Sequence, residues 1–217
     1  MNEQQQTLDE LQHIKKMMER SSRFISLSGL SGVAAGMCAL AGAWFANNVI
    51  VENGGPSGYR EVFIRPLDSM TLQDFLGHRL FQIAIVTFCA AFCFSFLFTW
   101  LRSKKNNTPI WGYTAQRLLI NVAVPMVAGG IYLFKQMQFG NYGLIAPGCL
   151  IFYGLALVNA SKYTYGEIRW LGYCQLLLGI INCWFVGYGL YFWAMGFGVL
   201  HILYGIVMWY RYEKNKQ

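Results

Sequence analysis

Residues 170–210 read WLGYCQLLLGIINCWFVGYGLYFWAMGFGVLHILYGIVMWY, and these 41 consecutive residues carry no charged side chain. A helix needs about 17–25 mainly apolar residues to cross the roughly 30 Å hydrocarbon core of a bilayer, so the stretch is too long for one span. Gly187 and Gly189 stand near its middle. Because glycine is typical of tight turns, we expect two membrane helices joined by a turn at this point.

Four further stretches also lack charged residues, and each is long enough to cross a membrane once. They are residues 24–51, 80–101, 118–134 and 136–161. Inside lipid every backbone polar group needs a partner within the protein, which restricts spans to helices or closed barrels. The stretches lack the alternation of apolar and polar residues that barrel strands show. The sequence therefore predicts an all-α polytopic membrane protein, a bundle of six transmembrane helices arranged as three hairpins.

The same pattern divides the chain into three segments. Residues 1–23 are polar, with apolar residues at helical spacing, and predict a short amphipathic helix on the cytoplasmic side. Residues 24–210 form the transmembrane domain, in which residues 47–78 make one long outer loop. Residues 211–217 form a basic cytoplasmic tail.

The distribution of basic residues predicts the orientation. With the N-terminus inside, only four of the 17 lysines and arginines fall on outer segments, namely Arg60, Arg65, Arg79 and Lys135. Loops on the cytoplasmic side carry the excess of positive charge, so both termini are predicted to be cytoplasmic. The net charge of +7 forms no basic stripe with interleaved aromatic residues, which argues against nucleic-acid binding. The expected partners are the lipid bilayer and either a second copy of the chain or a cytoplasmic protein.

Several motifs resemble those of a family of small bacterial six-span integral membrane proteins of uncharacterised function. They are SRFISLSGLSGVAAG at residues 22–36, RLLIN at 117–121, GLIAPGCLIFYGLALVNASKYT at 143–164, EIRWLG at 167–172 and YGLYFWAMGFGVLHILYG at 188–205. The resemblance implies a six-span protein of the bacterial inner membrane. It implies no reaction, substrate or catalytic residue.

Small residues mark one face of the first predicted span. They recur at spacings of three and four residues, at Gly29, Gly32, Gly36, Ala39 and Ala43. Small side chains let membrane helices approach closely, because association in lipid depends on close packing and not on the hydrophobic effect. The face is interpreted as a packing seam inside the monomer, with a homodimer contact as the alternative.

Polar residues inside the spans are the candidate intramembrane site, because polar groups in lipid need partners. Pro125 removes a backbone donor and so frees the carbonyl of Asn121, which predicts an interrupted third span. The other members of the candidate site lie on the last two spans: Gln175, Asn182, His201 and Tyr204. The functional interpretation is proton-coupled transport or ligand binding, since histidine titrates near neutral pH. The alternative is a neutral histidine with a purely structural hydrogen bond.

Glu167 is the only acidic residue between Asp74 and Glu213. Arg169 follows it closely, and Arg117 opens the third span at the same membrane face. An uncompensated charge at this depth is costly, so the three residues predict a structural ion pair. A cytoplasmic gate or a contact with a partner is the alternative.

The sequence shows no catalytic, metal-binding or cofactor-binding signature. We therefore expect a protein that is not an enzyme and that holds neither a metal nor another cofactor. Its leading interpretation is a small inner-membrane protein of transporter or permease type. The alternative is a membrane-embedded regulatory or scaffold protein that binds a cytoplasmic partner through residues 1–23 and the basic inner loops.

Overall fold

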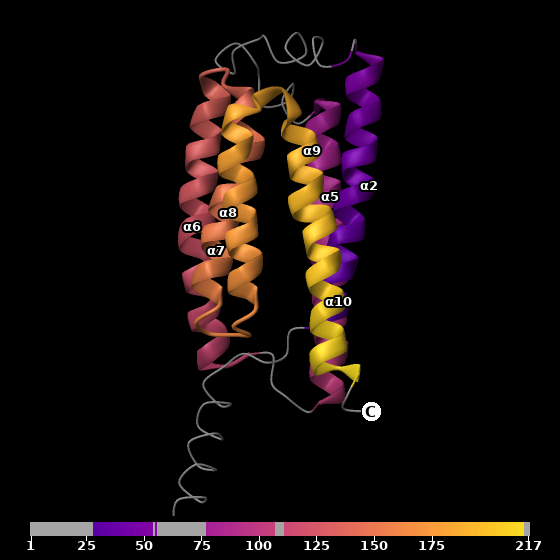
Figure 1. The fold of residues 1–217 in the computed structure, drawn as a ribbon, viewed down its shortest axis with the longest axis vertical. Helices are drawn as coiled ribbons and strands as arrows, with labels where there is room; N and C mark the ends of the chain where they lie inside the picture. The colour runs from indigo at the N-terminus through magenta and orange to yellow at the C-terminus, as the bar shows by residue number, and fades with distance from the viewer. Residues whose placement is uncertain (1–27, 54, 56–76, 107–110, 215–217) are drawn as a thin grey trace, which may run out of the picture.

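All regular structure in the described part of the chain is helical (Figure 1). The computed structural model describes residues 28–53, 55, 77–106 and 111–214. The elements are α2 (Gly29–Glu52), α5 (Arg79–Lys105), α6 (Tyr113–Gln138), α7 (Ile145–Ala160), α8 (Ile168–Trp184), α9 (Gly189–Trp193), the π-helix η4 (Ala194–Leu200) and α10 (His201–Tyr212). Two short 3-10 turns, η2 (Tyr142–Leu144) and η3 (Val186–Tyr188), precede α7 and α9. The predicted all-α class is confirmed, whereas the amphipathic helix predicted for residues 1–23 lies outside the described residues.

Five helical segments are long and apolar enough to cross a membrane, and they fit a membrane protein. They are Gly29–Glu52, Arg79–Lys105, Tyr113–Gln138, Tyr142–Ala160 and Val186–Tyr212. Helix α8 has 17 residues and is not among them. The 41-residue stretch does fold as two helices, with the turn at Phe185 and η3 directly before Gly189.

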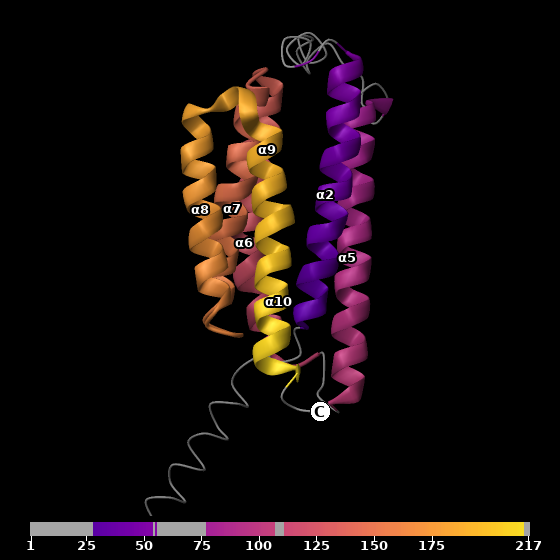
Figure 2. The same cartoon turned by 45° about the vertical axis from the view of Figure 1, so that its right-hand side comes forward.

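The helices form two groups that run parallel to the long axis of the molecule (Figures 1 and 2). One group contains α6, α7 and α8, with α7 packed against both neighbours. The other group contains α2, α5 and α10, with α2 packed against both α5 and α10. The continuous rod α9–η4–α10 joins the groups, because α9 and η4 contact α7 and α8 as well as α2.

Glycine faces produce the closest approach in the second group. A Cβ atom added at Gly36 would lie 2.6 Å from the carbonyl oxygen of Gly198, and one at Gly32 would lie 3.2 Å from the Cα of Gly205. Gly29 meets the backbone of Gly205 and Trp209 in the same way. Ala39 and Ala43 are buried further along α2. The structure thus places the small-residue face of α2 against η4 and α10 of the same chain.

One predicted helix interruption and two helix ends differ from the sequence prediction. Helix α6 runs without a break for 26 residues through Pro125, so the predicted interruption was wrong; membrane helices tolerate an internal proline when neighbours satisfy the backbone. Helix α2 continues to Glu52, past the predicted start of the outer loop at residue 47, because residues 43–53 contain no glycine or proline. Helix α10 extends to Tyr212, into the segment predicted as a tail.

Candidate functional site

A column of buried polar residues follows the interface between α8 and the α9–η4–α10 rod. Gln175 and Asn182 on α8 have no exposed surface, and His201 at the start of α10 is 7% exposed. The two amides are seven residues apart, about 10 Å along the helix axis. Tyr204 follows His201 by one turn, and its hydroxyl is also buried. The structure thus places four of the six predicted site residues along one interface.

The carbonyl oxygen of Gly196 is the centre of this column. It accepts hydrogen bonds from Gln175 Nε2 at 2.8 Å and from His201 Nδ1 at 3.0 Å. The other ring nitrogen of the histidine, Nε2, lies 2.8 Å from the hydroxyl of Tyr153 on α7. Because a carbonyl oxygen can only accept, Nδ1 carries the proton, and in the neutral ring Nε2 accepts from the tyrosine. The histidine therefore links α7 to η4, and Gln175 joins α8 to the same carbonyl oxygen of η4.

Two features of the rod make room for these bonds. Residues 194–200 adopt π-helical geometry, which is common at functional sites because it alters the regular α-helical hydrogen-bond pattern. Gly196 has no side chain, and a Cβ there would lie 2.5 Å from Gln175 Oε1. Gly189, seven residues earlier, lies near Asn182 in a looser contact, with 3.9 Å from its added Cβ to Oδ1 and 3.1 Å to Ala146 Cβ. Two glycines thus oppose two amides with the same spacing.

The amide oxygens of this column are unsatisfied acceptors. Gln175 Nε2 is bound to Gly196, and Asn182 Nδ2 donates to the carbonyl of Phe185 at 3.1 Å. Since both nitrogens face carbonyl oxygens, neither amide can be reversed without losing its bond. Among the described residues, Gln175 Oε1, Asn182 Oδ1 and the Tyr204 hydroxyl have no hydrogen-bond partner. A buried acceptor without a partner costs about 1–3 kcal/mol, and each of these groups keeps an unused capacity for a hydrogen bond.

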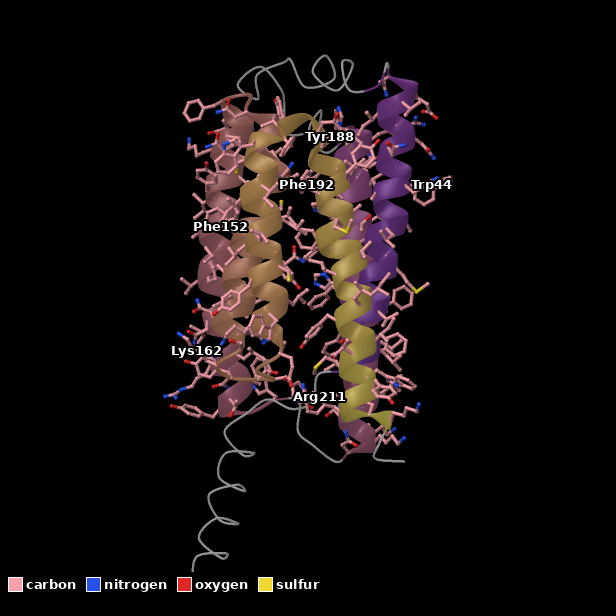
Figure 3. The ribbon with its side chains drawn as sticks, in the orientation of Figure 1. Trp44, Phe152, Lys162, Tyr188, Phe192 and Arg211 are labelled. Atoms are coloured by element: carbon pink, nitrogen blue, oxygen red, sulfur yellow. The ribbon has the colours of Figure 1, made fainter. Side chains whose placement is uncertain are left out.

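Asn121 and Pro125 do not join the column. Asn121 Nδ2 donates to the carbonyl of Arg117 in its own helix at 2.8 Å, and Pro125 is buried within α6. The reason is the packing of α6, whose main neighbour is α7. A Cβ at Gly129 would meet Phe152 of α7, at the position labelled in Figure 3. The predicted contribution of the third span to the polar site was therefore wrong.

A second polar cluster lies at the C-terminal end of the bundle. Glu213 Oε1 accepts from Arg102 Nη1 at 2.5 Å and from the backbone N–H of Gly29 at 2.6 Å. The side chains of Arg102 and Glu213 are 9% and 17% exposed. Arg102 also donates to the hydroxyl of Tyr165 at 3.3 Å. Burial raises the pKa of the Tyr165 hydroxyl, and the carboxylates of Glu213 and Glu167 raise it further. The Arg102 guanidinium acts in the opposite direction and lowers this pKa, but the net shift is upward.

The ion pair predicted for Glu167 has a different partner. Its carboxylate pairs with Arg211 at 3.0 Å and accepts from the Tyr212 hydroxyl at 2.5 Å. Arg169 instead donates to Ser161 at 3.4 Å, and the Arg117 guanidinium lies over the ring of Tyr113. Glu167 and Arg169 therefore bind different partners. Arg117 belongs to α6, which packs mainly against α7. Figure 3 shows Lys162 and Arg211 at the same end of the bundle, opposite Tyr188.

Sequence reasoning missed several residues that complete the polar column and the second polar cluster. Tyr153, Arg102, Arg211 and Glu213 contribute side chains, and Gly196 contributes a carbonyl oxygen. The sequence did contain one signal for the polar column. The spacing of seven residues between Gln175 and Asn182 recurs between Gly189 and Gly196, on the other side of the turn. Glu213 was also recognisable as the first acidic residue after the last charge-free stretch.

The fold and the column define the class of protein, and the comparisons add no family to it. The long apolar helices fit a membrane protein with a polar interior. The chain matches no protein-family model, no curated protein sequence and no solved structure. Within the described ranges, no group of three histidine, cysteine or acidic residues lies close enough to hold a metal ion.

Proposed function

We propose that this chain is a transporter-type protein of the bacterial inner membrane. In this proposal α8 is a sixth span and both termini lie in the cytoplasm. The supporting observation is the pair of fully buried amide oxygens, Gln175 Oε1 and Asn182 Oδ1, which have no partner in the described structure. Apolar packing alone gives no reason for two such acceptors in the interior of a membrane bundle.

The chemistry of the column restricts the solute. The available groups are amide oxygens and a tyrosine hydroxyl, and the carboxylate of Glu167 acts electrostatically on that hydroxyl, the one of Tyr204. These groups favour a small solute that donates hydrogen bonds, such as water, urea or an ammonium ion, over an anion. His201 adds a group that can take up a proton at Nε2 when Tyr153 turns its hydroxyl away.

Permeability of proteoliposomes tests this function. Stopped-flow light scattering would measure water and urea, and an internal pH dye would measure ammonium and methylammonium. The wild-type protein is expected to raise the permeability to at least one of these solutes. Gln175→Leu and His201→Phe are expected to abolish the increase, because each keeps the side-chain size and removes the polar atoms.

Gln116→Leu provides the matched control, since Gln116 is an exposed amide on α6 and its replacement should leave the permeability unchanged. Thermal unfolding of each variant in detergent would show that the bundle is intact. If wild-type and protein-free vesicles are equally permeable to all four solutes, the proposed function is wrong.

The scaffold alternative depends on the basic inner loops and on residues 1–23, and the latter lie outside the described residues. The described clusters provide no observation that favours it.

A further inference from the structure

A groove runs between parts of α2 and α5, and none of its lining residues belongs to the polar column. It encloses about 590 Å³ and is lined by both helices from Cys38 to Glu52 and from Arg79 to Ala90. Most of its exposed wall is apolar, with Phe45 and Val49 of α2 and Ile83 and Val86 of α5 among the lining residues. Three uncharged polar side chains also line it: Asn48, Gln82 and Thr87. Fourteen residues of α2 separate Cys38 from Glu52, which is about 21 Å of helix. The groove therefore extends along a large part of two helices that are long and apolar enough to cross a membrane.

Two opposite charges stand at the mouth of this groove. Arg79 Nη1 lies 3.6 Å from Glu52 Oε2, and the side chains are 74% and 66% exposed. An exposed pair of this length contributes little to stability, so both groups remain accessible to a ligand. A guanidinium binds phosphate oxygens through its forked N–H donors, and a carboxylate accepts hydrogen bonds from a primary ammonium group.

We propose that this groove binds one phospholipid with a zwitterionic headgroup that carries a primary amine. One acyl chain lies along the apolar walls between α2 and α5. The phosphate binds Arg79, and the ammonium group binds Glu52. A glycerol headgroup has no cation for Glu52, and a choline headgroup has no N–H to donate, so both lipids bind more weakly. This inference is independent of the proposed transport function, because no residue of the polar column lines the groove.

Native mass spectrometry of the full chain, purified in detergent, tests the proposal. The protein is incubated separately with phosphatidylethanolamine, phosphatidylcholine and phosphatidylglycerol that share the same acyl chains. Phosphatidylethanolamine is expected to be retained about two- to fivefold better than the other two, the range that an exposed ion pair supports. Glu52→Gln should remove the preference for the amine, and Arg79→Gln should weaken retention of all three lipids.

Lys135→Gln is the matched control, because it removes a positive charge from the C-terminal end of α6, away from the groove. Ala90→Phe fills the groove between the helices and should lower the retention of every lipid, which separates acyl-chain binding from headgroup binding. Thermal unfolding of each variant distinguishes a lost site from a lost fold. Equal retention of the three lipids by the wild-type chain, a preference for phosphatidylglycerol, or no lipid above the detergent background would each overturn the proposal.

Discussion

At the scale of single residues, Glu213 connects helices that are distant in the sequence. Helix α2 begins without a side-chain cap from its own N-cap residue, Ser28. The carboxylate of Glu213, which lies 184 residues further along the chain than Gly29, accepts the first backbone N–H of the helix. A negative charge at this position also compensates the positive end of the helix dipole. The same carboxylate neutralises Arg102 of α5, so this side chain at the end of α10 stabilises the ends of two other helices.

Glu213→Gln is therefore expected to destabilise the protein by about 3 kcal/mol, since loss of one partner leaves the nearly buried Arg102 without a neutralising charge. Thermal unfolding in detergent measures the effect. Glu52→Gln is the control, because the Glu52–Arg79 pair is exposed and its loss should change stability by less than about 1 kcal/mol. Equal shifts for the two variants would show that burial does not strengthen the Glu213 pair.

At the scale of elements, glycines decide which helices come together. On α2, Gly29, Gly32 and Gly36 face η4 and α10, and Gly42 faces Thr87 of α5. Between α7 and α8 a Cβ added at Gly154 would lie 2.9 Å from the carbonyl oxygen of Gly172. In lipid, close backbone contact is a main source of helix–helix attraction. The glycine faces therefore determine the two groups of helices seen in Figure 1.

Gly36→Ala tests the contact between α2 and η4. The added methyl group would meet the Gly198 carbonyl oxygen at 2.6 Å and the backbone nitrogen of Ile202 at 3.0 Å. Backbone atoms cannot turn away as side chains do, so we expect a loss of about 1–3 kcal/mol in thermal unfolding. Gly130→Ala is the opposite case: nothing lies within 4 Å of its added Cβ, and alanine stabilises a helix interior by roughly 0.5–1 kcal/mol relative to glycine. If Gly36→Ala is as stable as Gly130→Ala, the helices do not pack as described.

At the scale of the whole molecule, the length of α8 bears on how many times the chain crosses the membrane. Helix α8 is about 26 Å long at 1.5 Å per residue, slightly less than the roughly 30 Å of a hydrocarbon core. It packs against α7 along its length with glycines of both helices in contact. That packing favours a sixth span, since α7 together with η2 is long enough to cross.

Cysteine labelling of intact cells tests this topology in a variant that lacks the six native cysteines. Asn141→Cys and Gly187→Cys are expected to react with an impermeant maleimide from outside. Lys162→Cys should react only after permeabilisation. Reaction of Asn141→Cys without Gly187→Cys would show that α8 does not cross, and the reverse labelling of positions 141 and 162 would invert the predicted orientation.

The sequence by itself determined the helices of this protein. A charge-free stretch that is long enough to span lipid must satisfy its backbone internally, and that requirement acts within each segment. The turn before Gly189 and the small-residue face of α2 were readable for the same reason, because spacing along one helix is a local property.

Only the tertiary structure decided which helix faces meet. In lipid, apolar residues do not reveal a buried side, because the surroundings are as apolar as the interior. The sequence therefore could not show that Tyr153 bonds to His201, that Glu167 pairs with Arg211, or that Asn121 stays outside the polar column. The position of Asn121 depends on the packing of α6 on α7. The bonds of His201 depend on the π-helical segment, which presents Gly196 to Gln175 and His201. Glycine contacts bring together helices that are distant in the chain.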